Sequence, residues 1–413
     1  MGHIIKRDDI VWWKAWAIRV ISVVFALIVC GLLTMLLTGE NPISVYESMI
    51  KGAIGTERRV WRLLQDLAIL LCISLAVTPA FKMKFWNIGA EGQVLIGGLA
   101  TAACSMFLSD SMPTYLLIPV MFIASMVAGA IWAVIPAFFK ANWNTNETLF
   151  TLMMNYIAIQ LVSYFCFIYS VPKGSGKIPL LPKVSWLPTF GDNDYLVNII
   201  IVAVLTVLMF IYLKHTKHGY EISVVGESEN TARYAGIDVA KVTLRTMLIS
   251  GAICGLCGFI IVAGNKHTIA TNTAGGNGFT AIIVAWLAKF NTFYMALISF
   301  MLIFLEKGAG QIASSFGLND FITDIISGII LFCILGSDIT KYVRVTKYKF
   351  IRYCVSHIAK IECTLFFAYL CIENHLQQQI AKLLLNLLQI TTRQGIYKFI
   401  SFLYGVSYQS FEC

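Results

Sequence analysis

The chain has 413 residues, of which 58% are hydrophobic and 13% are charged. That charged fraction is about half of the ~25% found in soluble domains, and the mean hydropathy is +0.75. These values exclude a soluble enzyme, a disordered chain and a collagen-like fibre, and they predict an all-α polytopic membrane protein. Lys and Arg number 31 against 22 Asp and Glu, a net charge of +9. In a membrane protein this excess indicates basic cytoplasmic loops and no nucleic-acid partner.

Ten apolar segments are predicted to cross the bilayer, because about 20 apolar residues are needed to span roughly 30 Å of hydrocarbon. Five of them reach or nearly reach that length, whereas the segment that contains Pro79 and those of the second half are shorter. In chain order they are Ile18–Leu37, Leu67–Phe81, Ile88–Phe107, Tyr115–Phe139, Leu149–Tyr169, Tyr195–Leu213, Met247–Ala263, Phe279–Phe290, Phe293–Leu305 and Phe321–Leu335.

Lys and Arg placement sets the orientation of these spans. With the N-terminus inside, basic residues are twice as frequent on inner segments as on outer ones, as the positive-inside rule requires. Ten spans then place both termini in the cytoplasm. We expect an uncleaved first span and a multi-pass protein of the cell (cytoplasmic) membrane, with residues 1–345 as its transmembrane domain and 346–413 as a C-terminal extension of unknown role.

The polar segment Asn87–Gln93 stands at the entrance of an otherwise apolar span. Polar groups inside a membrane usually face the bundle interior and mark function, which makes Asn87, Glu91 and Gln93 candidate pathway residues. Alternatively, Asn87 caps the helix and Glu91 lies at its positive end. Asn155, in the fifth span, either binds substrate or bonds a neighbouring helix. Asp324, in the last span, needs a partner or water.

Two loops carry further signals. Residues 170–194, rich in Pro and Gly, form the longest extracytoplasmic loop, which either contacts an outside partner or simply connects two spans. Residues 218–237 form the longest cytoplasmic loop. Ser228 or Asn230 can cap a short helix there and Gly236 can end it in the left-handed conformation. Such a helix suits docking into a groove of a partner, although a solvated loop is the alternative.

The second half contains broken segments. Phe279–Phe290 and Phe293–Leu305 are each too short to cross alone, and both border glycines. Because backbone polar groups in lipid must be satisfied internally, interrupted helices occur where protein or a water-filled cavity surrounds them, often on a transport pathway. A tight helix–turn–helix away from the pathway is the alternative.

Four ordered motifs, at Asn87–Gln93, 146–158, Gly226–Ile237 and Gly278–Ala288, make residues 10–345 resemble permease subunits of nucleoside and simple-sugar ABC importers, within the ribose and branched-chain amino acid permease superfamily. The resemblance implies an ABC ATP-binding subunit, a second permease subunit and an extracytoplasmic substrate-binding lipoprotein as partners, and a coupling helix within 218–237. The candidate pathway residues are Asn87, Glu91, Gln93, Asn155 and Asn277. The implied coupling residues are Gly226, Glu227, Asn230, Ala232, Arg233, Ala235 and Gly236.

The sequence therefore predicts the transmembrane subunit of an ATP-driven importer. No phosphate-binding loop motif is present, so ATP hydrolysis is expected in a separate subunit, and neither an enzyme nor a metal or cofactor site is expected here. Scattered Asn, Gln and Gly favour a neutral polar solute, a nucleoside first and a simple sugar second. The rival hypothesis is an ion-coupled secondary transporter that uses membrane carboxylates such as Glu91 or Asp324.

Overall fold

The computed structural model describes residues 4–6, 12–38, 42–171, 174–189 and 193–317, with short pieces at 325–326, 328–329, 332–333, 336 and 343–345. The chain divides into two units, Val11–Ile339 and a second that combines Met1–Ile10 with Thr340–Cys413. In the second unit, strands β1 (Ile4–Lys6) and β2 (Val343–Val345) pair antiparallel. The fold and site described below belong to Val11–Ile339.

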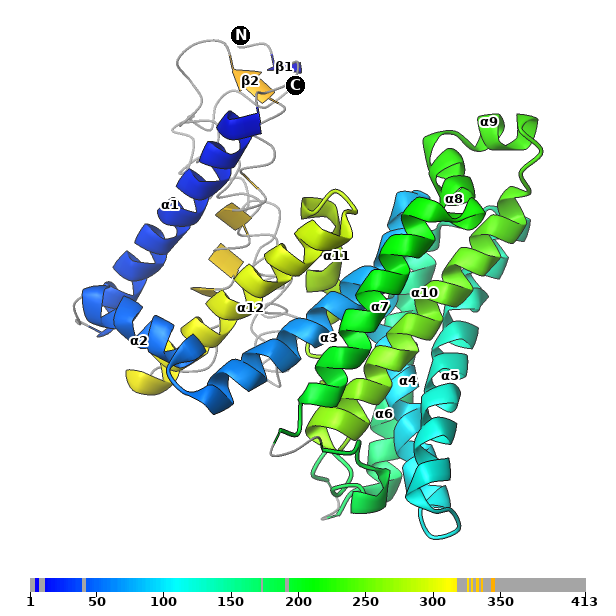
Figure 1. The fold of residues 1–413 in the computed structure, drawn as a ribbon, viewed down its shortest axis with the longest axis horizontal. Coiled ribbons are helices and arrows are strands. Elements are labelled where there is room, and N and C mark those ends of the chain that lie inside the picture. Colours follow the sequence, from blue (N-terminus) through cyan, green and yellow to red (C-terminus); the bar gives the residue numbers. More distant parts are fainter. Residues whose placement is uncertain are drawn as a thin grey trace, which may run out of the picture. The chain divides into compact units, whose positions relative to one another are not determined.

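The larger unit is helical (Figure 1). Its first half contains α1 (Trp12–Thr38), α2 (Pro42–Ile54), α3 (Glu57–Lys82), α4 (Ala90–Leu108), α5 (Thr114–Trp143) and α6 (Glu147–Tyr169). The 3-10 turn η1 (Lys183–Ser185) follows, and then α7 (Leu196–His215), α8 (Lys217–Glu227), α9 (Glu229–Tyr234), α10 (Val239–Ile261), the π turn η2 (Val262–Lys266), α11 (Asn277–Leu287) and α12 (Thr292–Ser315).

Seven helices in the described part of the chain are long and apolar enough to cross a membrane. The all-helical membrane class is thus confirmed, whereas the predicted total of ten spans is not reached by the described residues. The seven are α3, α4, α5, α6, α7, α10 with η2, and α12. Asp324, most of the predicted last span and the extension 346–413 lie outside the described residues.

Several predicted boundaries are wrong because the helices continue through charged residues. The segment predicted as Leu67–Phe81 is the 26-residue helix α3, and Phe293–Leu305, predicted too short to span, belongs to the 24-residue helix α12. Helical hydrogen bonds do not depend on side-chain polarity, so a hydropathy window ends before the helix does. By contrast α11 has only 11 residues, so a short helix in the second half is confirmed.

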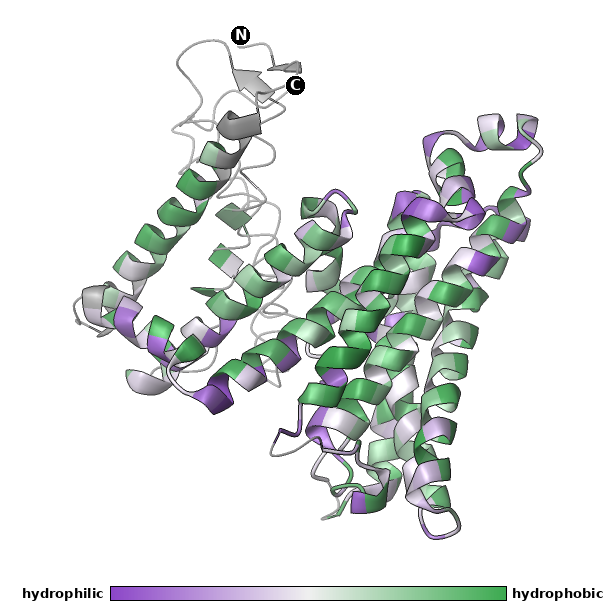
Figure 2. Cartoon of the chain, viewed as in Figure 1, coloured by the Kyte–Doolittle hydropathy of each residue, from purple (hydrophilic) through white to green (hydrophobic). Residues whose placement is uncertain are grey.

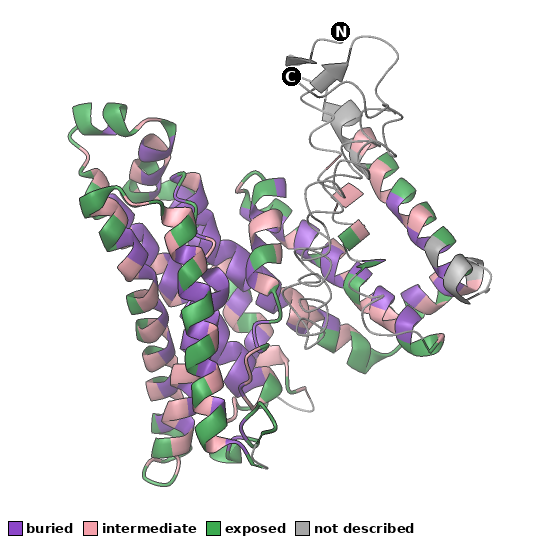
Figure 3. Ribbon diagram, turned by 180° about the vertical axis from the view of Figure 1, so that it is seen from behind, coloured by how far each residue is buried: buried purple, intermediate pink, exposed green. Residues whose placement is uncertain are grey.

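Helices α3 and α10 form the centre of the bundle. About 83% of the apolar window in each is buried, against 22% in α5 and in α7, and Figure 3 shows the buried residues gathered between the helices. Figure 2 shows that the outward faces of the helices are nonetheless mostly hydrophobic, as lipid-facing surfaces must be. Gly255 permits a close approach of α10 to α5, since a Cβ there would lie 2.1 Å from the carbonyl oxygen of Ser125.

Candidate functional site

Glu91, in the first turn of α4, binds the N-terminus of α11. Its Oε1 accepts a hydrogen bond from the Gly276 amide at 2.8 Å and its Oε2 accepts one from the Gly278 amide at 2.7 Å. A helix N-terminus carries unsatisfied N–H groups and a partial positive charge, so a carboxylate is the matching partner. Gly276 has φ +76°, and a Cβ on Gly278 would lie 2.6 Å from the Glu91 nitrogen. Both glycines are therefore required by this contact.

Asn87 and Gln93 bond each other at the base of α4. The Gln93 Nε2 donates to the Asn87 Oδ1 at 3.1 Å, and the Asn87 Nδ2 lies 3.4 Å from the Gln93 Oε1 and from the Ser250 Oγ on α10. The prediction that Asn87 caps α4 is wrong in position, since the capping residue is Gly89. Asn87 Oδ1 still accepts the Gly89 amide, at 3.1 Å. Both side chains are buried and fully engaged with protein.

Asn155 ties α6 to the segment that opens α4. Its Oδ1 accepts the Gly92 amide at 2.9 Å and its Nδ2 donates to the Ile88 carbonyl at 2.9 Å. This geometry matches the alternative of a contact between helices. Asn277, in the first turn of α11, donates to the Ala274 carbonyl at 2.9 Å and is only half-buried. The five predicted pathway residues thus gather where α4 and α11 begin.

Three charged residues of the same region were missed by the sequence analysis. Lys266 ends η2 and donates to the Thr273 carbonyl at 3.0 Å, and it interacts electrostatically with Asp66, Glu91 and Lys307. Asp66 on α3 and Lys307 on α12 form an ion pair. The predicted spans ended before Lys266 and Lys307 and began after Asp66, so these residues were assigned to loops. A helix prediction that extended through single charges would have found them.

The loop between α6 and α7 packs against the segment that joins η2 to α11. The Ile178 and Leu181 amides donate to the carbonyls of Ile269 and His267, at 3.3 and 2.9 Å, and the Thr268 hydroxyl donates to the Ile178 carbonyl at 2.8 Å. The Trp186 ring stacks on the His267 imidazole, with centroids 3.8 Å apart and planes 10° apart. This loop therefore supports the return of the chain towards Glu91.

His267 makes that contact sensitive to pH. Burial lowers the pKa of His267 from its ordinary value of 6.5, and the charge of Asp194 opposes this in part. A depressed folded-state pKa means that the neutral form stabilises the fold. This stability is complete above about pH 6.5 and is lost as the pH falls through the lower folded pKa.

We therefore expect thermal unfolding of the purified protein to shift to lower temperature between pH 7.5 and 5.5. His267→Asn, which tolerates the left-handed φ of 51°, should show a smaller shift. Identical pH dependence in the two proteins would contradict this account. Trp186→Leu measures the combined contribution of the stacking and of the Trp186 Nε1 hydrogen bond to the Leu181 carbonyl.

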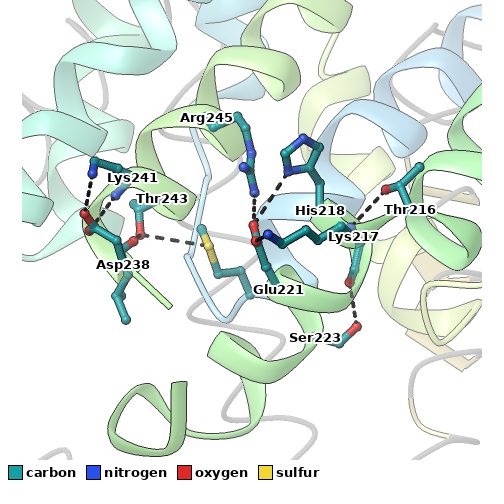
Figure 4. Close-up of polar contacts among 12 residues, drawn as sticks. Thr216, Lys217, His218, Glu221, Ser223, Asp238, Lys241, Thr243 and Arg245 are labelled. Atoms are coloured by element: carbon teal, nitrogen blue, oxygen red, sulfur yellow. Dashed lines mark hydrogen bonds and ion pairs between the residues drawn. The ribbon is translucent and has the colours of Figure 1, made fainter. Parts of the chain in front are cut away.

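The segment between α7 and α10 folds into α8 and α9, which pack against the ends of α3 and α10. Glu221 on α8 accepts a hydrogen bond from Arg245 on α10 at 2.6 Å. The His218 Nδ1 lies 3.6 Å from the same carboxylate (Figure 4). The Arg245 hydrogen bond lowers the pKa of Glu221 below its ordinary value. Gly226 contacts the end of α3 closely, because a Cβ there would lie 2.1 Å from the Lys82 carbonyl oxygen. Lys84 donates to the Glu227 carbonyl at 3.4 Å.

The short helix expected in this loop is present as α9. Ser228 is its N-cap, with its Oγ accepting the Thr231 amide at 3.3 Å, and Gly236 follows it with φ +76°. Ala232 is buried, whereas Arg233 is exposed and lies 3.9 Å from Glu229. Tyr234 is 93% exposed. The helix thus keeps one face against the bundle and presents the other outward. The residues predicted for coupling, Gly226, Glu227, Asn230, Ala232, Arg233, Ala235 and Gly236, lie on this α8–α9 unit.

Comparison with known proteins places this geometry in a family. The chain is 32% identical to the guanosine ABC transporter permease protein NupP of Bacillus subtilis, over 76% of this chain and 91% of the relative. It is 29% identical to the glucose ABC transporter permease protein TsgB13 of Haloferax volcanii, over 82% and 92%. It is 28% identical to the nucleoside ABC transporter permease protein NupB of Lactococcus lactis, over 77% and 90%. The family model for the permease component of branched-chain amino acid transport systems matches residues 60–335. The chain belongs to this permease family.

Proposed function

We propose that the chain is the membrane-spanning subunit of an ABC importer that moves a neutral polar solute, a nucleoside or, as the second candidate, a simple sugar. The observation that carries the proposal is the similarity over most of the chain to permeases that are named for guanosine, nucleosides and glucose. The balanced charges of Asp66, Lys307, Lys266 and Glu91 favour a solute without net charge, since a strongly charged one requires a compensating charge lining.

The proposed topology has ten spans. Seven are the long helices described above, α1 provides an eighth, and the predicted segment Phe279–Phe290, most of which belongs to the half-length helix α11, provides a ninth. The predicted segment Phe321–Leu335 provides the tenth. This count places both termini in the cytoplasm and α8–α9 on the cytoplasmic side of the cell membrane.

We place the solute pathway beside the N-terminus of α11. Asn272, Gly275 and Gly276 are exposed in a non-helical segment that meets Glu91 within the bundle. Non-helical backbone at membrane depth is tolerated only where it is buried in protein or lines a water-filled cavity. Half-helices with their N-termini near the midplane are common at transporter binding sites, which supports the same placement.

The proposed partners act on opposite faces. A separate ATP-binding subunit would bind the outward face of α9, where Arg233 and Tyr234 are exposed, and its nucleotide cycle would shift the permease between two arrangements. A substrate-binding lipoprotein would dock on the outside, where loop 170–194 connects to His267 and Ile269. A second permease subunit would complete the pathway.

Reconstitution tests the proposal directly. In vesicles, the chain alone should accumulate neither guanosine nor glucose, whereas the complex with its ATP-binding subunit and binding protein should accumulate one of them only when ATP is hydrolysed. A protonophore should leave this uptake unchanged. Uphill uptake by the chain alone, driven by an ion gradient, would contradict the proposal and support a secondary transporter.

A further inference from the structure

The Asp66–Lys307 ion pair lies inside two spans and connects them. Asp66 follows the start of α3 by nine residues and Lys307 precedes the end of α12 by eight, so at 1.5 Å per residue each lies roughly 12–14 Å from its helix end. The two helices run antiparallel at this point, and Figure 1 shows these ends side by side. Charges at such depth occur where they face the bundle interior or water rather than lipid.

The side chains of the Asp66–Lys307 ion pair are partly exposed. The Asp66 side chain is 22% exposed and that of Lys307 33% exposed. Lys266, on a third helix, interacts electrostatically with both and also with Glu91. Lys266 thus links the ion pair of α3 and α12 electrostatically to Glu91, the carboxylate that binds the N-terminus of α11.

Gln65, which precedes Asp66 in the chain, is a buried polar residue. The Gln65 side chain is fully buried, and among the described residues neither its Oε1 nor its Nε2 has a partner. Two contacts set the register of α3 on α10: Cys72 Sγ with the Ile253 carbonyl, and Cys257 Sγ with the Ile69 carbonyl. Continuing that register by one turn places Gln65 opposite the end of α10. A buried amide without a partner is costly, and a polar solute that separates these helices would supply partners.

We propose that Asp66 and Lys307 are specificity-determining residues, which hydrogen-bond the vicinal hydroxyl groups of the sugar ring as the solute passes. This inference rests on the proposed function and deepens it. A carboxylate only accepts hydrogen bonds and an ammonium only donates them, whereas a hydroxyl does both. Two adjacent hydroxyls can donate to Asp66 while one accepts from Lys307. The pair carries no net charge, so it recognises the ring without attracting ions. Vicinal hydroxyls are also the feature that nucleosides and simple sugars share.

The test compares two solutes in the complete complex, guanosine and 2′,3′-dideoxyguanosine, or glucose and 2-deoxyglucose if guanosine is not transported. The ratio of their uptake efficiencies is measured for the wild type and for Asp66→Asn. The same binding protein serves both complexes, so its own preference cancels. We expect the ratio to fall at least about fivefold in Asp66→Asn, because a hydrogen bond to a charged group is lost only by the solute that has the hydroxyls.

The matched control is Glu47→Gln, which removes a carboxylate from an exposed ion pair with Lys51 on α2 and should leave the ratio unchanged. If Asp66→Asn fails to assemble, Lys307→Gln supplies the same measurement. An equal loss for both solutes means that the pair only braces α3 against α12, and this overturns the inference while the proposed function stands. A wild-type complex that transports neither guanosine nor glucose overturns both.

Discussion

Glu91→Ala should reduce solute uptake by the complete complex about 100-fold or more. The substitution leaves the Gly276 and Gly278 amides without their acceptor. The Gly278 amide is buried, and an unsatisfied buried amide costs about 1–3 kcal/mol. It also removes the negative charge at the positive end of α11. The helix should then leave the position in which its N-terminus faces the proposed pathway. Uptake rate and thermal unfolding of the purified complex measure the two consequences.

A graded series separates the charge from the hydrogen bonds. Glu91→Gln retains one acceptor oxygen and should fall between wild type and Glu91→Ala, with a loss of roughly tenfold. The control is Glu147→Gln, since Glu147 is also a first-turn carboxylate of a span but pairs at 3.0 Å with Lys140. This pair joins α5 to α6 and does not involve α11, so its loss should leave the contact between Glu91 and α11 unchanged. Wild-type uptake by Glu91→Ala would show that the α11 contact has no role in transport.

Gly226→Ala should uncouple the α8–α9 unit from the bundle. Its new Cβ would lie 2.1 Å from the carbonyl oxygen of Lys82, a backbone atom that cannot rotate away, so α8 must shift. Overpacking of this kind typically costs about 1–3 kcal/mol. We expect uptake to fall about tenfold or more while the permease domain itself stays folded. Uptake and ATP hydrolysis measured on the same preparation show whether the partner's cycle still drives transport.

Ser223→Ala is the control on the same helix. The Ser223 hydroxyl only donates to the Gly219 carbonyl one turn back, a bond whose loss has little effect on a helix. Full, ATP-coupled uptake in Gly226→Ala would contradict the role given to this contact. Loss of uptake in both variants would indicate that α8 tolerates no substitution, so that the effect would not be specific to the Gly226 contact.

In the α8–α9 loop, local sequence patterns were enough to predict where a helix begins and ends. The sequence predicted Ser228 or Asn230 as the cap and Gly236 as a left-handed terminator. The structure has Ser228 as the cap and a positive φ at Gly236, because capping depends on residues within one turn. The same applies to the short helix α11, whose preceding glycines mark the interruption. Amphipathic or apolar length likewise predicted the segments that became α5, α6 and α7.

The contacts among the charged residues of the proposed pathway could not be predicted from local sequence patterns. By itself the sequence determined the membrane class, the positions of most helices and the family resemblance, since apolar length, caps and ordered motifs are local properties. Only the tertiary structure decided that Glu91 caps α11 and that Asp66, Lys266 and Lys307 interact. Glu91 and Gly276, about 185 positions apart, meet because the chain turns back after Lys266, where the loop between α6 and α7 contacts His267 and Ile269. Asp66 and Lys307 meet because α3 packs against α12. Neither contact follows from a local pattern.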